Sequence, residues 1–480
     1  MSSIAWDGEA ADGLWSSPTN WSGTVVPGSQ DDVTVDVAGD VTITLRGTPG
    51  AVKSLINHET LFVEGRTSSG KATLTVTNDF TNYGTLRMET TSNDSGDRGS
   101  YLVINSGTLT NAATGTIDVR VGQGDGRSIT GNVTNLGTIQ TQAGTTLEIK
   151  GTNELFTQAG GAINSSGEFL LNGGTFSFTG GSLTGTVRAL SSSISVSDTV
   201  TEPSTLRVVG ASSKLVSDLP SSVELWVEGT NAYGRAVLTV DADVVSHGRI
   251  RLETTSNDSS DRGSYLTIAS GKSLTNASDG TIESKPGQGD GRVVSGYLIN
   301  QGTISVPSPL LEFVGTLDAA GGTYASEFFV RDSVIRVLAG STTPLHLVGA
   351  SNQLLTDNVA GSTLWVDGTS RYGLSKLTIS DNLTNYGTIR LETTSNDSRD
   401  CGSYLTIASG KSLTNAGDGI VESRLGQGDG RLISGRLINE GAISVPTGLL
   451  EFVGTLDAAG GTYAAEFFVR DSAIRVLAGS

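Results

Sequence analysis

Three stretches of this chain are almost identical to one another: Glu89–Tyr101, Glu253–Tyr265 and Glu392–Tyr404. Each reads Glu-Thr-Thr-Ser-Asn-Asp-Ser-x-Asp-x-Gly-Ser-Tyr, where x varies. Self-similarity of this length is typical of an array of stacked units, in which each unit contacts only its neighbours, rather than of a single globular core. The repetition therefore constrains the fold more strongly than the composition does.

The spacing between matched residues indicates a smaller structural unit. Glu89 and Glu253 are 164 positions apart, whereas Glu253 and Glu392 are 139 apart, a difference of 25 residues. Deleting one whole turn leaves a stack of strands intact, while deleting part of a turn would place every later side chain on the wrong face. The difference therefore has the size expected of one turn of a repeated coil.

A short motif recurs inside the large repeat. It has the form apolar-Thr-Asn-x-Gly-Thr or a close variant, and three pairs of its asparagines are 24 residues apart, namely Asn111 and Asn135, Asn276 and Asn300, and Asn415 and Asn439. Outside these motifs apolar residues alternate with Thr or Ser, as in Val41–Leu45, and Gly, Asn, Asp and Ser mark turns. The pattern predicts an all-β chain: a right-handed parallel β-helix of roughly 18–20 coils of about 24 residues.

The recurrent asparagines have two explanations. At one position in successive coils, their side chains could stack into an internal amide ladder, each bonded to the next. Alternatively, Asn occurs there because it tolerates the left-handed backbone conformation that a tight turn requires. The sequence leaves both explanations open.

The ends of the chain differ from its middle. Three of the five tryptophans lie within residues 1–30, which fit no coil position, so we expect an N-terminal cap there; a sugar-stacking aromatic patch is the alternative. Residues 31–480 are predicted to form a single β-solenoid with three large repeats, at about 50–205, 206–344 and 345–480. The last repeat is incomplete, because Ile474–Ser480 matches Ile335–Ser341, after which the chain runs on. We therefore expect the natural protein to continue with further repeats.

Charge limits the partners that we expect. The chain carries 31 Lys and Arg against 49 Asp and Glu, for a net charge of −18, whereas nucleic acids and anionic lipids need a basic surface. No stretch approaches the ~20 apolar residues of a membrane-spanning helix, and no signal peptide is visible. We expect no nucleic-acid partner and no membrane insertion.

One cysteine, Cys401, stands where Arg98 and Arg262 stand in the earlier repeats. Exchange with Arg in a polar loop predicts an exposed side chain. A single cysteine also excludes a disulfide scaffold.

The opening between Trp6 and Gly28, Trp-x-Gly…Trp-Ser-x-Pro-x-Asn-Trp-x-Gly…Pro-Gly, is similar to openings of repeat modules in large secreted bacterial β-solenoid proteins. The coil motif resembles those of autotransporter passengers and filamentous-haemagglutinin-like adhesins. The resemblance implies a right-handed parallel β-helix exported to the cell surface, with roles in adhesion, matrix building or surface coating. It carries no functional residue over to this chain.

Catalytic residues are not evident in the sequence. A polysaccharide-active β-helix enzyme, of the lyase or glycosidase kind, would need clustered carboxylates with Lys, Arg or His on one face. The three histidines, His58, His247 and His346, are dispersed, and a catalytic site is normally unique, whereas the notable polar residues here occur in triplicate. We expect no enzyme activity, and keep this enzyme class as the alternative.

Two triplicated loops are candidates for binding. In the first, oxygen donors at alternate positions could coordinate Ca²⁺, although the same residues also favour turns. The candidate binding residues are Asn93, Asp94, Asp97, Asn257, Asp258, Asp261, Asn396, Asp397 and Asp400, of which the six Asp are the candidate calcium ligands. The second loop, Gly-Gln-Gly-Asp-Gly-Arg, ends at Arg127, Arg292 and Arg431, and we interpret it as a tight turn fixed by an Asp–Arg pair rather than as a phosphate loop.

Together these observations predict an extracellular or cell-surface bacterial protein with a structural or adhesive role. Its expected partners are other copies of itself or surface glycans, and Ca²⁺ is the only cofactor that the loops suggest.

Overall fold

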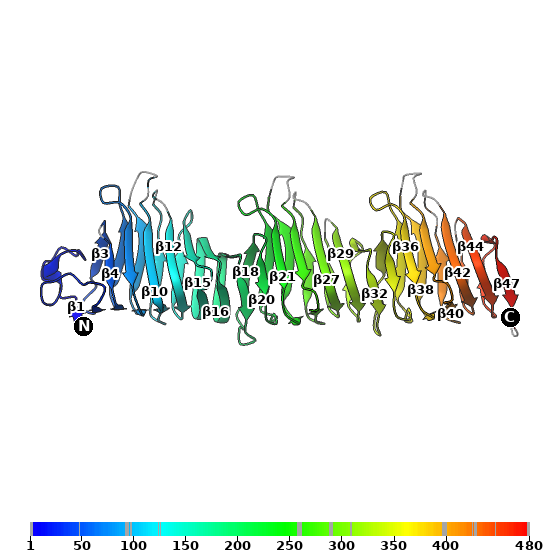
Figure 1. Cartoon of the computed structure of the whole chain (residues 1–480), viewed down its shortest axis with the longest axis horizontal. Helices are drawn as coiled ribbons and strands as arrows, with labels where there is room; N and C mark the ends of the chain where they lie inside the picture. Colours follow the sequence, from blue (N-terminus) through cyan, green and yellow to red (C-terminus); the bar gives the residue numbers. More distant parts are fainter. Residues whose placement is uncertain are drawn as a thin grey trace. The chain divides into compact units, whose positions relative to one another are not determined.

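The structure is a computed structural model of the 480-residue chain (Figure 1). It describes every residue except 1, 2, 48, 92–95, 97, 123, 125, 257–261, 288–290, 308, 309, 396–400, 425, 427–429, 447 and 478–480. Within the described residues there is no α-helix, and a single 3₁₀ turn, η1, spans Pro18–Asn20. None of the described residues forms a helix that is long and apolar enough to cross a membrane.

The chain divides into two compact units, which are described separately. The first unit comprises Met1–Glu228 with Ala232–Leu238, and the second comprises Gly229–Asn231 with Thr239–Ser480. The division into three large repeats and the boundary of the cap at residue 30 stay predictions.

Short strands make up most of each unit. The first twenty strands are β1 (Ser3–Ala5), β2 (Asp32–Val35), β3 (Thr42–Arg46), β4 (Gly50–Val52), β5 (Ser54–Asn57), β6 (Thr60–Gly65), β7 (Ala72–Val76), β8 (Phe80–Asn82), β9 (Thr85–Thr90), β10 (Ser100–Asn111), β11 (Thr116–Val119), β12 (Arg127–Asn135), β13 (Thr138–Thr141), β14 (Thr146–Lys150), β15 (Leu155–Asn172), β16 (Thr175–Leu190), β17 (Ser193–Val196), β18 (Ser204–Val209), β19 (Ser213–Leu215) and β20 (Val223–Gly229).

The strands that follow are β21 (Ala236–Val240), β22 (Val244–Ser246), β23 (Arg249–Thr254), β24 (Ser264–Ile268), β25 (Leu274–Asn276), β26 (Thr281–Ser284), β27 (Arg292–Asn300), β28 (Thr303–Ser305), β29 (Leu311–Ala319), β30 (Thr323–Tyr324), β31 (Phe328–Arg331), β32 (Val334–Val337), β33 (Leu345–Val348), β34 (Asn352–Leu354), β35 (Thr363–Gly368), β36 (Ser375–Ile379), β37 (Leu383–Asn385), β38 (Thr388–Thr393), β39 (Ser403–Ile407), β40 (Leu413–Asn415), β41 (Ile420–Ser423), β42 (Arg431–Asn439), β43 (Ala442–Ser444), β44 (Leu450–Ala458), β45 (Thr462–Tyr463), β46 (Phe467–Val469) and β47 (Ala473–Val476).

Alternation along each strand decides which side chains form the core. In β3, Ile43 and Leu45 are buried, while Thr42 is exposed and Thr44 is half-buried. The β3 strand pairs in parallel with β6, which places Ile43 beside the equally buried Leu61. Because side chains alternate between the two faces of a strand, this register stacks apolar residues on the inside of successive coils.

Parallel pairing between coils establishes the fold class. Phe80 pairs with Leu109, Leu109 pairs with Val133, and Phe156 pairs with Phe176, each in a parallel register. The β16 strand then pairs with β17, where Phe176 lies opposite Ile194. Each unit is thus built from coils whose strands pair with the next coil, and the predicted parallel β-solenoid is confirmed.

The asparagines form the amide ladder that was one of two explanations for them. Asn57 donates to Asn82 at 2.9 Å, Asn82 donates to Asn111 at 2.8 Å, and Asn111 donates to Asn135 at 2.8 Å. Asn135 then donates to Gln158 at 2.9 Å, and all five side chains are fully buried. The second unit has the same bonds between Asn276 and Asn300, Asn358 and Asn385, Asn385 and Asn415, and Asn415 and Asn439.

The N-terminal tryptophans pack against one another. Trp6, Trp15 and Trp21 are at most 3% exposed, and Trp21 makes edge contacts with the other two at ring-centre distances of 4.9 and 4.7 Å. Backbone bonds from Trp6 to Thr34 and from Trp15 to Thr44 join this segment to β2 and β3. Since no indole face is exposed, these rings offer no surface on which a sugar could stack.

Candidate functional site

The loop residues that the sequence suggested for binding fall outside the part of the chain that the structure describes. They are Asn93, Asp94, Asp97, Asn257, Asp258, Asp261, Asn396, Asp397 and Asp400. Calcium binding by the six Asp therefore stays a prediction. In the part of the chain that the structure does describe, no three or more His, Cys, Asp or Glu side chains are grouped so as to hold a metal ion.

The arginine that ends the second loop is described in all three copies. Arg127 is buried, and its Nη2 donates to the hydroxyl of Thr90 at 2.8 Å and to the carbonyl of Gly122 at 3.2 Å. Burial lowers the pKa of this guanidinium. The same two bonds recur for Arg292 with Thr254 and Gly287, and for Arg431 with Thr393 and Gly426. The arginine thus ties the loop to an earlier strand, while its expected partners Asp125, Asp290 and Asp429 lie outside the described residues.

A column of aromatic and charged side chains crosses five strands of the second unit. Phe329, His346, Trp365, Arg390 and Glu422 occupy matched positions in β31, β33, β35, β38 and β41. The His346 ring stacks on Trp365 at 4.0 Å, and the Arg390 guanidinium lies 5.7 Å from the Trp365 ring centre. The Arg390 Nε donates to Glu422 at 3.0 Å. Because β33 and β38 flank β35, the Trp365 indole is covered on both sides.

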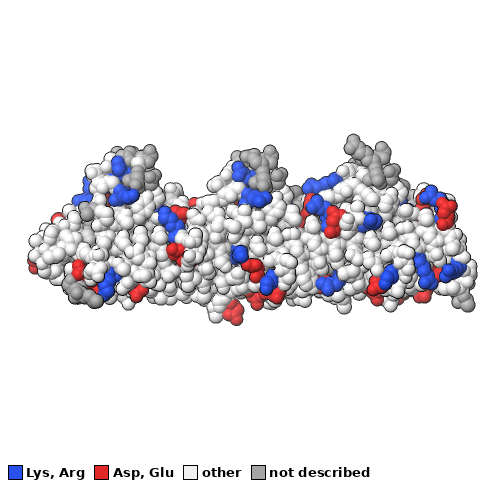
Figure 2. Space-filling view, in the orientation of Figure 1, with Lys and Arg blue, Asp and Glu red and all other residues white. Residues whose placement is uncertain are grey.

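The first unit uses the same combination of residue types. The Arg87 guanidinium lies 4.4 Å from the ring centre of Phe62, which pairs with it in register, and its Nε donates to Glu89 at 2.7 Å. Arg207 lies 4.2 Å from the ring centre of Trp226, its register partner in β20. On the face shown in Figure 2, Lys and Arg lie beside Asp and Glu in several small mixed groups.

A tyrosine from a short hairpin contacts this column. The bridge between Thr369 and Gly373 closes the hairpin, and the Tyr372 hydroxyl donates to Glu312 at 2.6 Å, 60 residues earlier. In the first unit, Tyr233 donates to Glu168 at 2.9 Å, 65 residues earlier. Burial, followed by the Glu168 charge, raises the pKa of Tyr233 to about 12, and burial also raises the pKa of Tyr372. Both phenols are therefore hydrogen-bond donors at neutral pH.

We expect Tyr372→Phe to lower the free energy of unfolding of the second unit by about 1.5 kcal/mol, because Glu312 would lose a hydrogen-bond donor while the ring contacts stay. Urea denaturation would measure the change, and Tyr233→Phe is the matched variant in the first unit. Tyr386→Phe, at a ring that is 46% exposed, is the control and should be nearly neutral. Equal effects of Tyr372→Phe and Tyr386→Phe would contradict the importance of the bond to Glu312.

Two carboxylates lie side by side next to this column. Asp367 in β35 pairs in register with Glu392 in β38. Asp367 is fully buried and accepts hydrogen bonds from the backbone N–H and the hydroxyl of Thr394, at 2.9 and 2.8 Å, and contacts His346 Nε2 at 2.6 Å. Burial is the main cause that raises the pKa of Glu392, and the charge of Asp367 adds to it. Neighbouring carboxylates, one of which has a raised pKa, are groups that acid–base catalysis can use.

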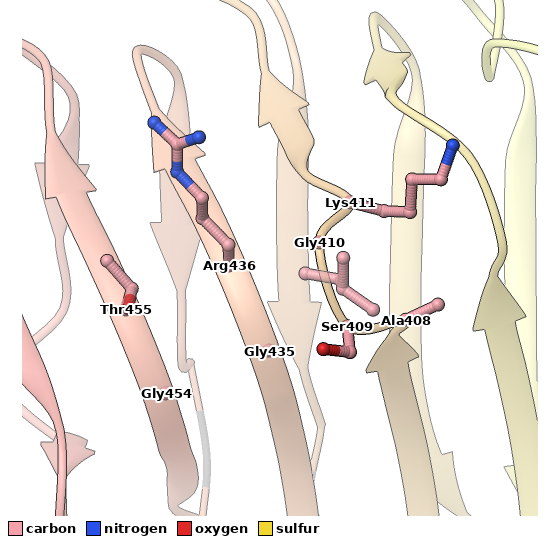
Figure 3. Close-up of a pocket in the computed structure, with 9 residues that line it drawn as sticks. Ala408, Ser409, Gly410, Lys411, Gly435, Arg436, Gly454 and Thr455 are labelled. Atoms are coloured by element: carbon pink, nitrogen blue, oxygen red, sulfur yellow. The ribbon is translucent and has the colours of Figure 1, made fainter.

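A hollow of about 330 Å³ lies beside a pair of glycines in two neighbouring strands (Figure 3). Gly435 and Gly454 pair in register with φ of 109° and 143°, and a Cβ on Gly454 would lie 2.0 Å from the Gly435 carbonyl oxygen. Lys411 and Arg436 border the hollow, but Figure 3 shows both extending away from these glycines. They pair instead with Asp381 and Asp457, both at 2.7 Å. The hollow therefore offers no unpaired cation to an anion.

The prediction that Cys401 is exposed is wrong, because the residue is only 3% exposed. Its backbone packs closely on β35: a Cβ added to Gly368 would lie 1.6 Å from the Cys401 carbonyl oxygen. Two residues later, the Ser403 hydroxyl donates to the Val366 carbonyl oxygen at 2.9 Å. The short thiol side chain is enclosed at this position, whereas the arginines at the matching positions are only half-buried.

The three histidines lie in different surroundings. His58 stacks on Tyr83 at a ring-centre distance of 4.6 Å, and His247 Nδ1 contacts Asp279 at 2.8 Å on the surface. Only His346 is buried beside a buried carboxylate. The structure thus brings together His346, Asp367 and Glu392, which the sequence analysis did not group. Their spacing in the sequence gives no signal, because they come from three different coils.

Comparisons with family models, with curated proteins and with solved structures find no match to this chain. The case for a function therefore rests on the residues and contacts described above.

Proposed function

We propose that this chain is a segment of an extracellular structural or adhesive β-solenoid, part of a longer bacterial cell-surface or matrix protein that assembles with copies of itself or binds surface glycans. The observation that carries the proposal is the use of charged side chains to join coils. Glu228, for example, is 1% exposed and pairs with both Arg188 at 3.2 Å and Arg207 at 3.3 Å. These charged side chains stabilise the contacts between coils, as we expect of a protein with a load-bearing or display role.

The resemblance of the coil motif to autotransporter passengers and filamentous-haemagglutinin-like adhesins agrees with this proposal. The triplicated Asn-Asp-Ser loops are its candidate contact points, and Ca²⁺ is its candidate ligand there. Three copies of one weak contact would bind a repetitive surface far more tightly than one copy does.

Negative-stain electron microscopy and sedimentation, with and without calcium, would test the assembly role. Filaments that lengthen as the concentration rises would support self-assembly. Separate particles that bind on a glycan array would support adhesion, and separate particles that bind no glycan would contradict both roles. If filaments need calcium, replacing the Asp residues of all three loops with Asn should abolish them, while replacing the exposed Asp381 should not.

A polysaccharide-active β-helix enzyme is the second candidate, and the paired Asp367 and Glu392 beside His346 favour it. Assays on a panel of neutral and acidic polysaccharides, for reducing ends and for unsaturated products, would test this candidate. Activity that Glu392→Gln abolishes without unfolding the protein would establish the enzyme. Activity unchanged in this variant would place any catalysis elsewhere.

A further inference from the structure

The large repeats carry different cations at one equivalent position. In the first unit, Arg207 lies on the Trp226 ring at 4.2 Å and pairs with the buried Glu228 at 3.3 Å. Residues 139 positions later in the second unit keep the Trp but replace Arg by His and Glu by Asp. Arg stays charged at every pH at which proteins fold, whereas His loses its charge near neutral pH.

The replacement keeps the contacts of the original pair. His346 stacks on Trp365 with a ring-centre distance of 4.0 Å and an interplanar angle of 6°, and its Nε2 lies 2.6 Å from Asp367. His346 is 7% exposed and Asp367 is 0% exposed. Water therefore has little access to the pair in the folded chain.

Both ring nitrogens of His346 face hydrogen-bond acceptors. Nε2 faces the Asp367 carboxylate, and Nδ1 lies 3.2 Å from the Ser326 carbonyl oxygen. A neutral imidazole carries one N–H and one lone pair, so it can donate to only one of the two, whereas the imidazolium donates to both. The carboxylate itself already accepts two bonds from Thr394. This geometry fits a protonated His346.

The other charged groups around the pair do not replace the imidazolium. Arg331 and Arg371 are paired with Glu312, which also accepts the Tyr372 hydroxyl bond. Arg390 is paired with Glu422. Glu392 lies beside Asp367 in register. Loss of the His346 proton would leave Asp367 next to another carboxyl group without its cation, and would leave either Nδ1 or Nε2 without a proton to donate.

We propose that the His346–Asp367 pair makes β31, β33 and β35 a proton-sensitive joint, held together while His346 is an imidazolium and loosened when it loses its proton. The matching Arg207–Glu228 pair should leave β16, β18 and β20 insensitive to pH between about 6 and about 8.5, because Arg keeps its charge throughout. The bonds that need both ring protons are present while His346 is an imidazolium, and one of them is lost when the pH rises and a proton leaves. The Glu392 carboxyl acts in the same direction, because burial raises its pKa and its ionised form disfavours the fold.

Hydrogen exchange of the full chain tests the joint, with the first unit as internal reference. Protection of Leu345–Val348 and Thr363–Gly368 would be compared with that of Ser204–Val209 and Val223–Gly229 at about pH 6 and about pH 8.5, after correction for intrinsic exchange. We expect the protection ratio to fall at the higher pH, because the bonds that need the imidazolium are then lost. An unchanged ratio would overturn the proposal.

The double variant His346→Arg with Asp367→Glu installs the pair that the first unit already uses. The pH dependence of the ratio should disappear in this variant, and its persistence would overturn the proposal. If the variant does not fold, the variant His58→Gln with His247→Gln leaves His346 as the only histidine for ¹⁵N NMR. Protonation of both ring nitrogens at about pH 6, lost over the same range as the protection, would support the joint; a neutral ring at about pH 6 would overturn it.

Discussion

Replacing Asn111 with Leu is expected to lower the free energy of unfolding of the first unit by about 4 kcal/mol. Asn111 accepts the Asn82 amide at 2.8 Å and donates to Asn135 at 2.8 Å. It also donates to the carbonyls of Gly115 and Thr138, at 3.2 and 3.1 Å. The substitution would leave these groups without their partner, and an unsatisfied buried polar group costs about 1–3 kcal/mol.

Urea denaturation followed by circular dichroism would measure the loss. Asn105→Leu is the matched control, because Asn105 is exposed in the same strand, β10, and surface substitutions usually change stability by less than about 0.5 kcal/mol. A loss below about 1 kcal/mol for Asn111→Leu would mean that the ladder contributes little to the stability of the first unit.

The ladder shows which part of the fold can be predicted from the sequence. The 24-residue spacing of Asn111 and Asn135 brings equal residues to equal positions in neighbouring coils, and parallel pairing then aligns their amides. Periodicity therefore predicts the strands and their parallel register. It made the ladder one of two explanations for the asparagines, and the structure shows the ladder. A contact between two residues of the same type can be predicted where the step is constant, as it is for the three asparagine pairs that are 24 residues apart.

Contacts between unlike residues could not be predicted in the same way. Tyr372 and Glu312 are 60 residues apart, and they meet because a hairpin folds back across coils of unequal length. The step from Phe176 to its register partner Ile194 is 18 residues, whereas the step from Asn82 to Asn111 is 29. Periodicity does not fix such steps, so the grouping of His346, Asp367 and Glu392 became visible only in the structure.

Replacing Glu228 with Leu is expected to destabilise the first unit by about 3 kcal/mol. Glu228 is 1% exposed, and its two carboxylate oxygens pair with Arg188 and Arg207. Removing one partner of a buried ion pair costs about 3–5 kcal/mol, since the remaining charge is left without compensation. The lower end applies because both arginines keep some solvent contact and because Arg188 also pairs with Glu168 at 2.7 Å. Glu202→Leu, at an exposed carboxylate, is the control. Urea denaturation would again measure both variants, and similar losses in the two would show that the Glu228 pairs contribute no more than surface charges, contrary to the role in joining coils on which the proposed function rests.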